Sequence, residues 1–139
     1  MTDFKGYDVG PKPKIICLCG STRFIEQFAI TSWELEKQGH ITVGCHYLPP
    51  SYFESKGKLV VTDHLAESEG EDCKEHMDRL HFRKIELADE IFVLNVGGYV
   101  GESTQREINY ARSLGKKVRW FEHNIPLWKK TLNRIRGEL

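Results

Sequence analysis

Glu107 is the residue whose type and position most directly suggest chemistry. It lies in residues 95–111, NVGGYVGESTQREINYA, where a glycine-rich turn leads into a predicted helix over residues 102–114. At about 100° per residue, Glu107 falls on the face of this helix that should be buried. The helix N-terminus is close, and its dipole and free amides favour an ionised carboxylate. A buried carboxylate beside a glycine turn is what a nucleophile or general base needs.

The buried face of this helix is predicted to consist of Thr104, Ile108, Ala111 and Leu114. The alternative for Glu107 is a structural ion pair with Arg106 or Lys84. Because glycines permit tight turns and hydroxyl groups suit a helix start, the segment also offers ligand contacts. The predicted substrate contacts here are Asn95, Gly98, Gly101, Ser103 and Thr104.

A second candidate group lies on a predicted helix over residues 72–88. Its apolar arc is predicted to contain Met77, Leu80, Ile85, Leu87 and Ala88. His81 and Lys84 fall in the middle of this arc. Because an unpaired buried cation is very costly, they must have partners or reach into a pocket. Asp78 is one helical turn from His81, which predicts a hydrogen-bonded pair.

Two alternatives stay open for this helix. His81 could be a hydrogen-bonded core residue, while Lys84 extends its charge to solvent. A metal site formed by Cys73, His76 and His81 is the other, although its spacing fits no familiar zinc pattern.

The third candidate is the turn that follows residues 14–19, KIICLC. Gly20 permits a tight turn, and the hydroxyls of Ser21 and Thr22 could hold an anion with nearby backbone N–H groups. Arg23 adds a fixed positive charge. The alternative is that Ser21 or Thr22 is an N-cap and Arg23 is solvated. Neither a G-x-G-x-x-G nor a Walker A motif occurs to support a dinucleotide or triphosphate site.

Length, net charge and apolar content exclude several classes of protein. The 139 residues fit one domain, and 20 basic and 20 acidic residues give no net charge to attract nucleic acid or membranes. No apolar run approaches the roughly 20 residues of a membrane span, and the polar start is no signal peptide. We therefore expect a soluble cytoplasmic protein without metal or cofactor. Its four cysteines are predicted to be buried reduced thiols, with Cys17 and Cys19 on one face of a strand.

The elements that position these groups alternate between strand and helix. Strands are predicted over residues 14–19, 40–48, 90–96 and 116–122, with helices over 21–39, 72–88, 102–114 and a terminal segment from 124. The first helix has apolar residues at helical spacing, namely Phe24, Phe28, Ile30, Trp33 and Leu35. This order predicts a single doubly wound, Rossmann-like or flavodoxin-like α/β domain over residues 1–139. Its sheet should have four to five parallel strands with helices on both faces. Residues 49–71 are long for a connection and predict a lid, in which KLVVT forms a short strand or helix.

Three of these segments together resemble the nucleoside 2-deoxyribosyltransferase superfamily, including its deoxynucleoside 5′-monophosphate N-glycosidases. They are CGSTRF, LADEIFVLN and GESTQREINYARSLGKKV, which span about half the chain in the family's order. The resemblance implies that Glu107 attacks the anomeric carbon of a nucleoside and forms a covalent glycosyl enzyme. It also implies an acidic group that assists departure of the base. Asp78 is the first choice for that role, and strict register to LAD would instead select His81.

The chain departs from the family at one informative position. Free-nucleoside transferases usually have an aspartate six residues before the glutamate, where this chain has Gly101. Together with the GS-x-R turn, this favours a 5′-phosphorylated substrate held by Ser21, Thr22, Arg23 and Ser103 or Thr104. The family also implies a homodimer or larger homo-oligomer, in which a neighbouring subunit donates Asn124 or Asn133.

Three functions are therefore in competition. The first is cleavage or exchange of the N-glycosidic bond of a nucleoside or its monophosphate. The second is a non-catalytic nucleotide-sensing module on the same fold. An NAD-cleaving enzyme ranks last, because the sequence has no recognisable adenylate site.

Overall fold

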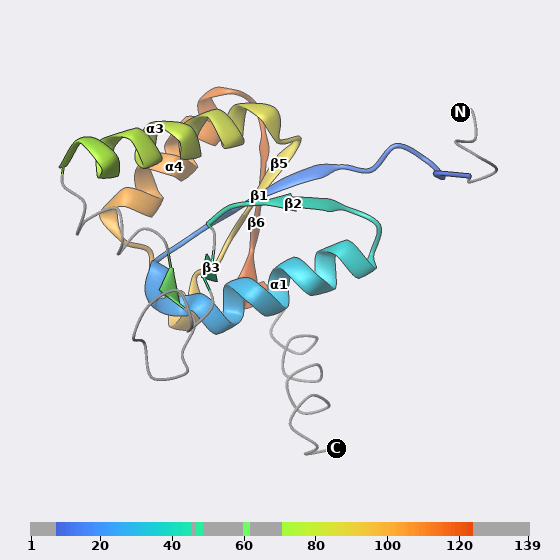
Figure 1. Ribbon diagram of the computed structural model, residues 1–139, viewed down its shortest axis with the longest axis horizontal. Helices are drawn as coiled ribbons and strands as arrows, with labels where there is room; N and C mark the ends of the chain where they lie inside the picture. The colour runs from blue at the N-terminus through green and yellow to red at the C-terminus, as the bar shows by residue number, and fades with distance from the viewer. Residues whose placement is uncertain (1–7, 46, 49–59, 62–70, 124–139) are drawn as a thin grey trace, which may run out of the picture.

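A four-stranded parallel sheet forms the centre of the protein (Figure 1). The computed structural model describes residues 8–45, 47–48, 60–61 and 71–123. The strands lie in the order β2-β1-β5-β6, with bounds β1 Ile15–Cys19, β2 Ile41–Val43, β5 Glu90–Val93 and β6 Lys117–Trp120. The helices are α1 Ile25–Lys37, α3 Glu71–Leu87 and α4 Glu102–Ser113. The predicted α/β class is confirmed, as is a parallel sheet with four strands.

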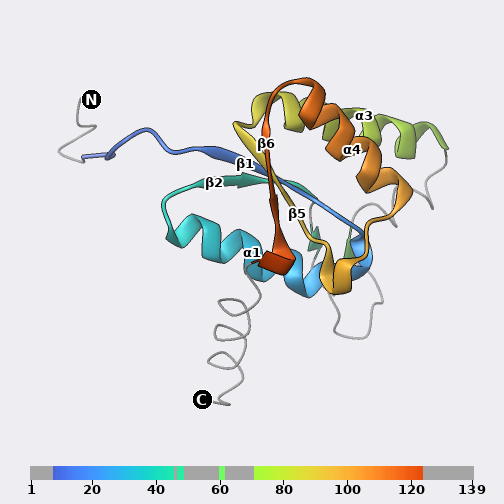
Figure 2. The same ribbon diagram turned by 180° about the vertical axis from the view of Figure 1, so that it is seen from behind.

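Helices cover both faces of this sheet. Figures 1 and 2 show α1 on one face and the pair α3 and α4 on the other. Side chains alternate accordingly along β1: Ile16 and Leu18 pack with Phe28 of α1, while Cys17 and Cys19 pack with residues of α3 and α4. This explains why β1 is a continuous apolar run, and it confirms that Cys17 and Cys19 share a face.

The connections that follow the two central strands, β1 and β5, diverge at the carboxyl ends of these strands. After β1 the chain enters α1 on one face, whereas after β5 it enters α4 on the opposite face. Neighbouring strands whose connections leave to opposite sides form a topological switch point, where α/β proteins bind ligands. The carboxyl ends of β1 and β5 are therefore where a site is expected.

The predicted second strand, residues 40–48, is wrong as a single element. It is divided into β2 and a separate β3 Tyr47–Leu48, which pairs antiparallel with β4 Val60–Val61. Between them, a Cβ on Gly44 would lie 3.3 Å from Leu18 Cβ, and the carbonyl of Gly44 accepts a hydrogen bond from Lys84. At Gly44 the backbone therefore forms a hydrogen bond with Lys84 of α3, and the chain leaves the sheet. The KLVVT segment contains a strand, while most of the predicted lid and the segment from 124 lie outside the described residues.

Four of the predicted core residues are exposed instead: Trp33, Leu80, Leu87 and Leu114. Phe28 and Ile85 define the buried faces of α1 and α3. Trp33 and Leu80 are five positions from these residues and Leu87 is two positions away, so at about 100° per residue these three side chains project away from the buried faces. Leu114 follows the last residue of α4. Among the described helices, none combines the length and apolar character that crossing a membrane requires.

Gly20 directly follows β1 and lies against Leu94, which directly follows β5. A Cβ at this position would lie 2.9 Å from Leu94 Cβ and 3.3 Å from the Leu94 carbonyl oxygen. We expect Gly20→Ala to lower the free energy of unfolding by about 1–3 kcal/mol, because it pushes the strand ends apart. In Gly101→Ala the new Cβ meets only the movable end of the Tyr99 side chain, and this control should lose less. Urea unfolding with equal stability for wild type and Gly20→Ala would contradict the packing described here.

Candidate functional site

A cavity of about 260 Å³ lies at the carboxyl ends of β1 and β5. Its walls come from the turn after β1, the segment after β2, one side of α3, and the N-terminal part of α4 with the loop before it. The residues that line it are Gly20, Ser21, Thr22, Gly44, Cys45, Lys74, Met77, Asp78, His81, Lys84, Tyr99, Gly101, Glu102, Ser103, Thr104 and Glu107. This is the position expected for a ligand in a doubly wound fold.

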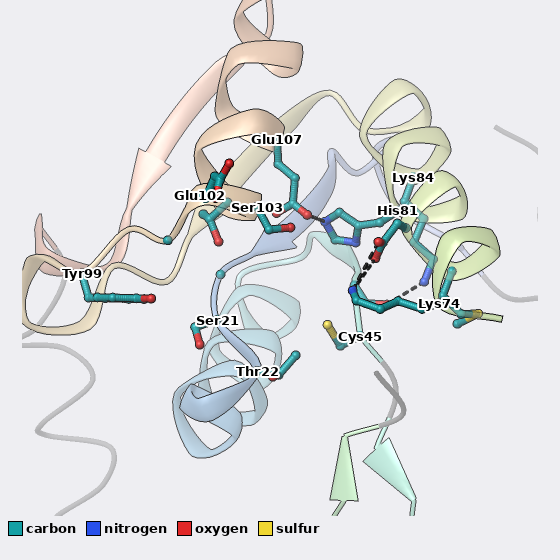
Figure 3. Close-up of a pocket in the computed structure, with 16 residues that line it drawn as sticks. Ser21, Thr22, Cys45, Lys74, His81, Lys84, Tyr99, Glu102, Ser103 and Glu107 are labelled. Carbon is teal, nitrogen blue, oxygen red and sulfur yellow. Dashed lines mark hydrogen bonds and ion pairs between the residues drawn. The ribbon is translucent and has the colours of Figure 1, made fainter. Parts of the chain in front are cut away.

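Glu107 faces this cavity from the second turn of α4. Only 14% of its side chain is exposed, and its Oε2 lies 3.5 Å from His81 Nε2. Figure 3 shows the two side chains pointing toward one another from α4 and α3. Arg106, proposed as an alternative partner, pairs with Glu102 instead. Glu107 therefore lies on the inward face of its helix, as the helical periodicity predicts, and it forms an ion pair with His81.

His81 lies between Glu107 and the two thiols of β1. Its Nε2 is 3.4 Å from Cys19 Sγ and 3.9 Å from Cys17 Sγ. Burial lowers the pKa of His81, but the hydrogen bond with Cys17 and the charge of Glu107 outweigh it and raise the pKa to about 9. At neutral pH an imidazolium therefore holds Glu107 in position.

The two thiols below His81 differ in acidity. The pKa of Cys17 falls to about 5, chiefly because Cys19 donates a hydrogen bond to it, with His81 and Lys84 adding to the effect against burial. The pKa of Cys19 is raised well above its ordinary value by the same hydrogen bond and by burial. Both are free cysteines, as is the half-buried Cys45, which agrees with the predicted reduced thiols. The side chain of Cys73 lies outside the described residues.

Asp78 lines the cavity but does not form the predicted pair with His81. Its carboxylate is about half exposed and lies 3.3 Å from Lys74 Nζ, one turn earlier on α3. The imidazole of His81 turns toward β1 and α4 instead, because the two thiols and Glu107 lie there. His76, from the alternative metal site, is exposed. Asp78 and His81 therefore reach the same cavity with different partners.

The turn after β1 contains the predicted N-cap and also lies at the cavity. Ser21 Oγ accepts hydrogen bonds from the backbone N–H of Arg23 at 3.4 Å and from its Nε at 3.2 Å, so it caps the short 3-10 helix Thr22–Phe24. Ser21 and Thr22 nevertheless line the cavity. The guanidinium of Arg23 lies 4.2 Å from the centroid of the Tyr99 ring and is not part of the lining. The turn thus reaches the cavity through Ser21 and Thr22, with Arg23 beside it.

The loop before α4 and the start of that helix place only some of the predicted substrate contacts at the cavity. Gly101, Ser103 and Thr104 line the cavity, and in the described part of the chain no side chain caps α4 at Gly101. Asn95 and Gly98 lie outside the lining. The Asn95 side-chain oxygen accepts the Glu122 N–H at 3.1 Å, and Gly98 has a φ of 82°. Both residues shape the turn rather than the cavity wall.

Several lining residues were not predicted: Gly44, Cys45, Lys74, Met77, Tyr99 and Glu102. Lys74 and Met77 lie on the same side of α3 as His81, at helical spacing from it, so the wheel contained that signal. The contact of His81 with Cys17 and Cys19 was also missed. Two signals for this contact were available in the sequence. They are the pair of thiols on one side of a strand and the histidine inside an apolar arc.

The chain was compared with protein-family models, curated proteins and solved structures. None of the three comparisons gives a match. What the cavity does must therefore be inferred from its residues and their geometry.

Proposed function

We propose that the protein cleaves or exchanges the N-glycosidic bond of a nucleoside or its 5′-monophosphate, with Glu107 as nucleophile. The observation that carries the proposal is the placement of Glu107. Its carboxylate is 14% exposed, held by His81, and directed into a cavity at the switch point of the sheet. The resemblance of CGSTRF, LADEIFVLN and GESTQREINYARSLGKKV to nucleoside deoxyribosyltransferases supports the same assignment.

The proposed reaction proceeds in two displacements. A carboxylate oxygen of Glu107 forms a bond to the anomeric carbon, while the bond from that carbon to the base nitrogen breaks and its electron pair stays on the base. Water, or the nitrogen of a second base, then forms a bond to the same carbon while the bond to Glu107 breaks, and the proton that the attacking group loses passes to the carboxylate of Asp78. His81 acts as a positioning residue, because its imidazolium fixes the carboxylate in the cavity.

The hydroxyl-rich side of the cavity supports a phosphorylated substrate. Ser21, Thr22 and Ser103 line the same cavity as Glu107, and Figure 3 shows them around one opening with it. The N-terminus of α4 adds backbone amides that favour an anion. We propose that these groups hold the 5′-phosphate, and that Lys74 contributes positive charge at the rim.

Asp78 is the proposed proton donor to the departing base. It lines the cavity on α3, across from the α4 residues, and its exposure allows it to exchange protons with water. We expect Asp78→Asn to lower kcat by about 10²-fold for substrates with neutral bases. A nucleotide with an N7-methylated, cationic purine needs no proton to leave, so its kcat should change little. Glu75→Gln, an exposed control on the same helix, should keep full activity. Equal losses of kcat for both substrates would contradict the role of Asp78 as acid.

The direct experiment incubates the protein with deoxynucleosides, ribonucleosides and their monophosphates, each with and without an acceptor base. Chromatography then measures free base and exchanged nucleoside. We expect free base from at least one monophosphate, and exchange products separate a transferase from a hydrolase. Binding of a nucleotide without any turnover would overturn the enzymatic proposal and favour a sensing module.

The oligomeric state and the cellular location of the protein are part of the same proposal. The homo-oligomer and the cytoplasmic location predicted from the sequence stay predictions. Size-exclusion chromatography with light scattering tests the first, because a dimer or larger assembly is expected at assay concentrations.

A further inference from the structure

Two buried thiols that the glycosidic chemistry does not require lie beside His81 at the cavity. Cys17 Sγ, Cys19 Sγ and His81 Nε2 all lie within 4.8 Å of one another. The two cysteines come from β1 and the histidine from α3, and both cysteines are buried. Two thiols and an imidazole are ligands that zinc and related thiophilic ions prefer.

We propose that Cys17, Cys19 and His81 bind one thiophilic divalent cation of the Zn²⁺ class, with Glu107 as the fourth ligand. This departs from the expectation, drawn from the sequence, of a protein without metal. It differs from the alternative with Cys73 and His76 because only His81 is common to the two sets.

The distances from His81 to the other three proposed ligands are close to those around a tetrahedral ion. With Zn–S of about 2.3 Å and Zn–N or Zn–O of about 2.0–2.1 Å, sulfur and nitrogen ligands lie about 3.6 Å apart. The same geometry places nitrogen and oxygen ligands about 3.4 Å apart. The two S–N distances to His81 are 3.4 Å and 3.9 Å, and the Glu107 Oε2 distance to Nε2 is 3.5 Å. The distances to His81 therefore fit a zinc-sized ion within a few tenths of an ångström, whereas the Glu107 carboxylate lies outside the group of Cys17, Cys19 and His81 and must move toward the thiols to become the fourth ligand.

Charge and access also favour a cation. Metal binding would displace the protons of Cys19 and His81, so that two thiolates and the Glu107 carboxylate would surround the ion with three negative charges, while Lys84 also lies along the cavity. A divalent ion together with the Lys84 ammonium balances these three charges. Cys17 and Cys19 are buried behind His81, whereas His81 and Glu107 line the cavity, so an ion enters from the cavity side.

The ion would regulate the proposed reaction. A carboxylate that ligates zinc cannot attack a sugar carbon, so bound metal and glycosyl transfer compete for Glu107. This inhibitory consequence rests on the proposed function, whereas the binding of the ion does not.

Cobalt titration of the reduced full-length chain tests the site directly. Co²⁺ bound by thiolates gives a sulfur-to-cobalt charge-transfer absorption, and tetrahedral geometry gives intense visible bands. We expect both at one ion per chain, with Zn²⁺ displacing the cobalt. The Cys17→Ser/Cys19→Ser variant should lose binding by more than about 100-fold, while Cys45→Ser, in the cavity wall but outside the group, should bind as wild type does. Absence of the charge-transfer band in the wild type would overturn the proposal.

X-ray absorption at the zinc edge keeps the test independent of variants that fold poorly. Wild-type protein loaded with one equivalent of Zn²⁺ should show two sulfur ligands at about 2.3 Å and lighter ligands at about 2.0–2.1 Å. A shell of oxygen and nitrogen alone would overturn the site.

Activity is measured separately, in metal-free protein and after Zn²⁺ addition. Base release that falls as Zn²⁺ fills the site supports competition for Glu107. Base release unchanged by a filled site overturns the inhibitory consequence. No base release from metal-free protein contradicts the glycosidase proposal and leaves the cobalt result standing.

Discussion

Glu107→Gln is expected to lower the rate of base release by at least about 10³-fold, because it removes the nucleophile of the proposed reaction. Glutamine retains nearly the same volume and still accepts a hydrogen bond from His81 at the position of Oε2. The variant should therefore fold and bind nucleotide with nearly unchanged affinity. The measurement is kcat on the best substrate of the nucleotide panel, together with the melting temperature and the nucleotide affinity.

Glu102→Gln is the matched control for this change. Glu102 belongs to the same helix and lines the same cavity, but its side chain is 92% exposed and pairs with Arg106. An exposed pair of this kind contributes little to stability. The control should keep kcat within about twofold of wild type, whereas full activity in Glu107→Gln would rule out Glu107 as the nucleophile.

Phe28→Ala is expected to lower the free energy of unfolding by about 3–5 kcal/mol, the largest stability effect that we predict. Phe28 is 1% exposed, belongs to the α1 side of the core with Ile16 and Phe92, and its ring approaches Gly20 at the end of β1. Truncation leaves a cavity between the helix and the sheet. Urea unfolding followed by circular dichroism measures the change.

Trp33→Ala controls for the loss of an aromatic residue from the same helix. Trp33 is 60% exposed, and its described ring contact is with Lys37 Nζ at 5.8 Å. Its removal should cost less than about 1 kcal/mol. Equal destabilisation by the two substitutions would show that α1 packs by a different face from the one described.

The central part of the fold could be predicted because its signals are local. β1 is a continuous apolar run, and β5 has three consecutive apolar residues after Glu90, which indicates strands buried on both faces. Gly39 and Gly115 mark helix ends. The division of residues 40–48 could not be predicted in the same way. It depends on the contact of Gly44 with Leu18 and on its hydrogen bond with Lys84, both of which join distant segments.

The same distinction applies to the site. The inward position of Glu107 follows from helix periodicity and from the strand end before it, which are local features. The partners of His81 are not local, since Cys17 and Cys19 lie 64 and 62 residues away in sequence. The local rule of one helical turn instead selected Asp78, which pairs with Lys74. A helical wheel identifies a face but not the residues that pack against it.

The most direct test of the central claim is to trap the glycosyl enzyme. Metal-free protein is mixed with an active deoxynucleoside monophosphate, quenched in acid within the first turnover, digested and analysed by mass spectrometry. We expect one added glycosyl group on the peptide that contains Glu107, and none in Glu107→Gln. A glycosyl group on another residue, or turnover with no labelled peptide at any quench time, would contradict it.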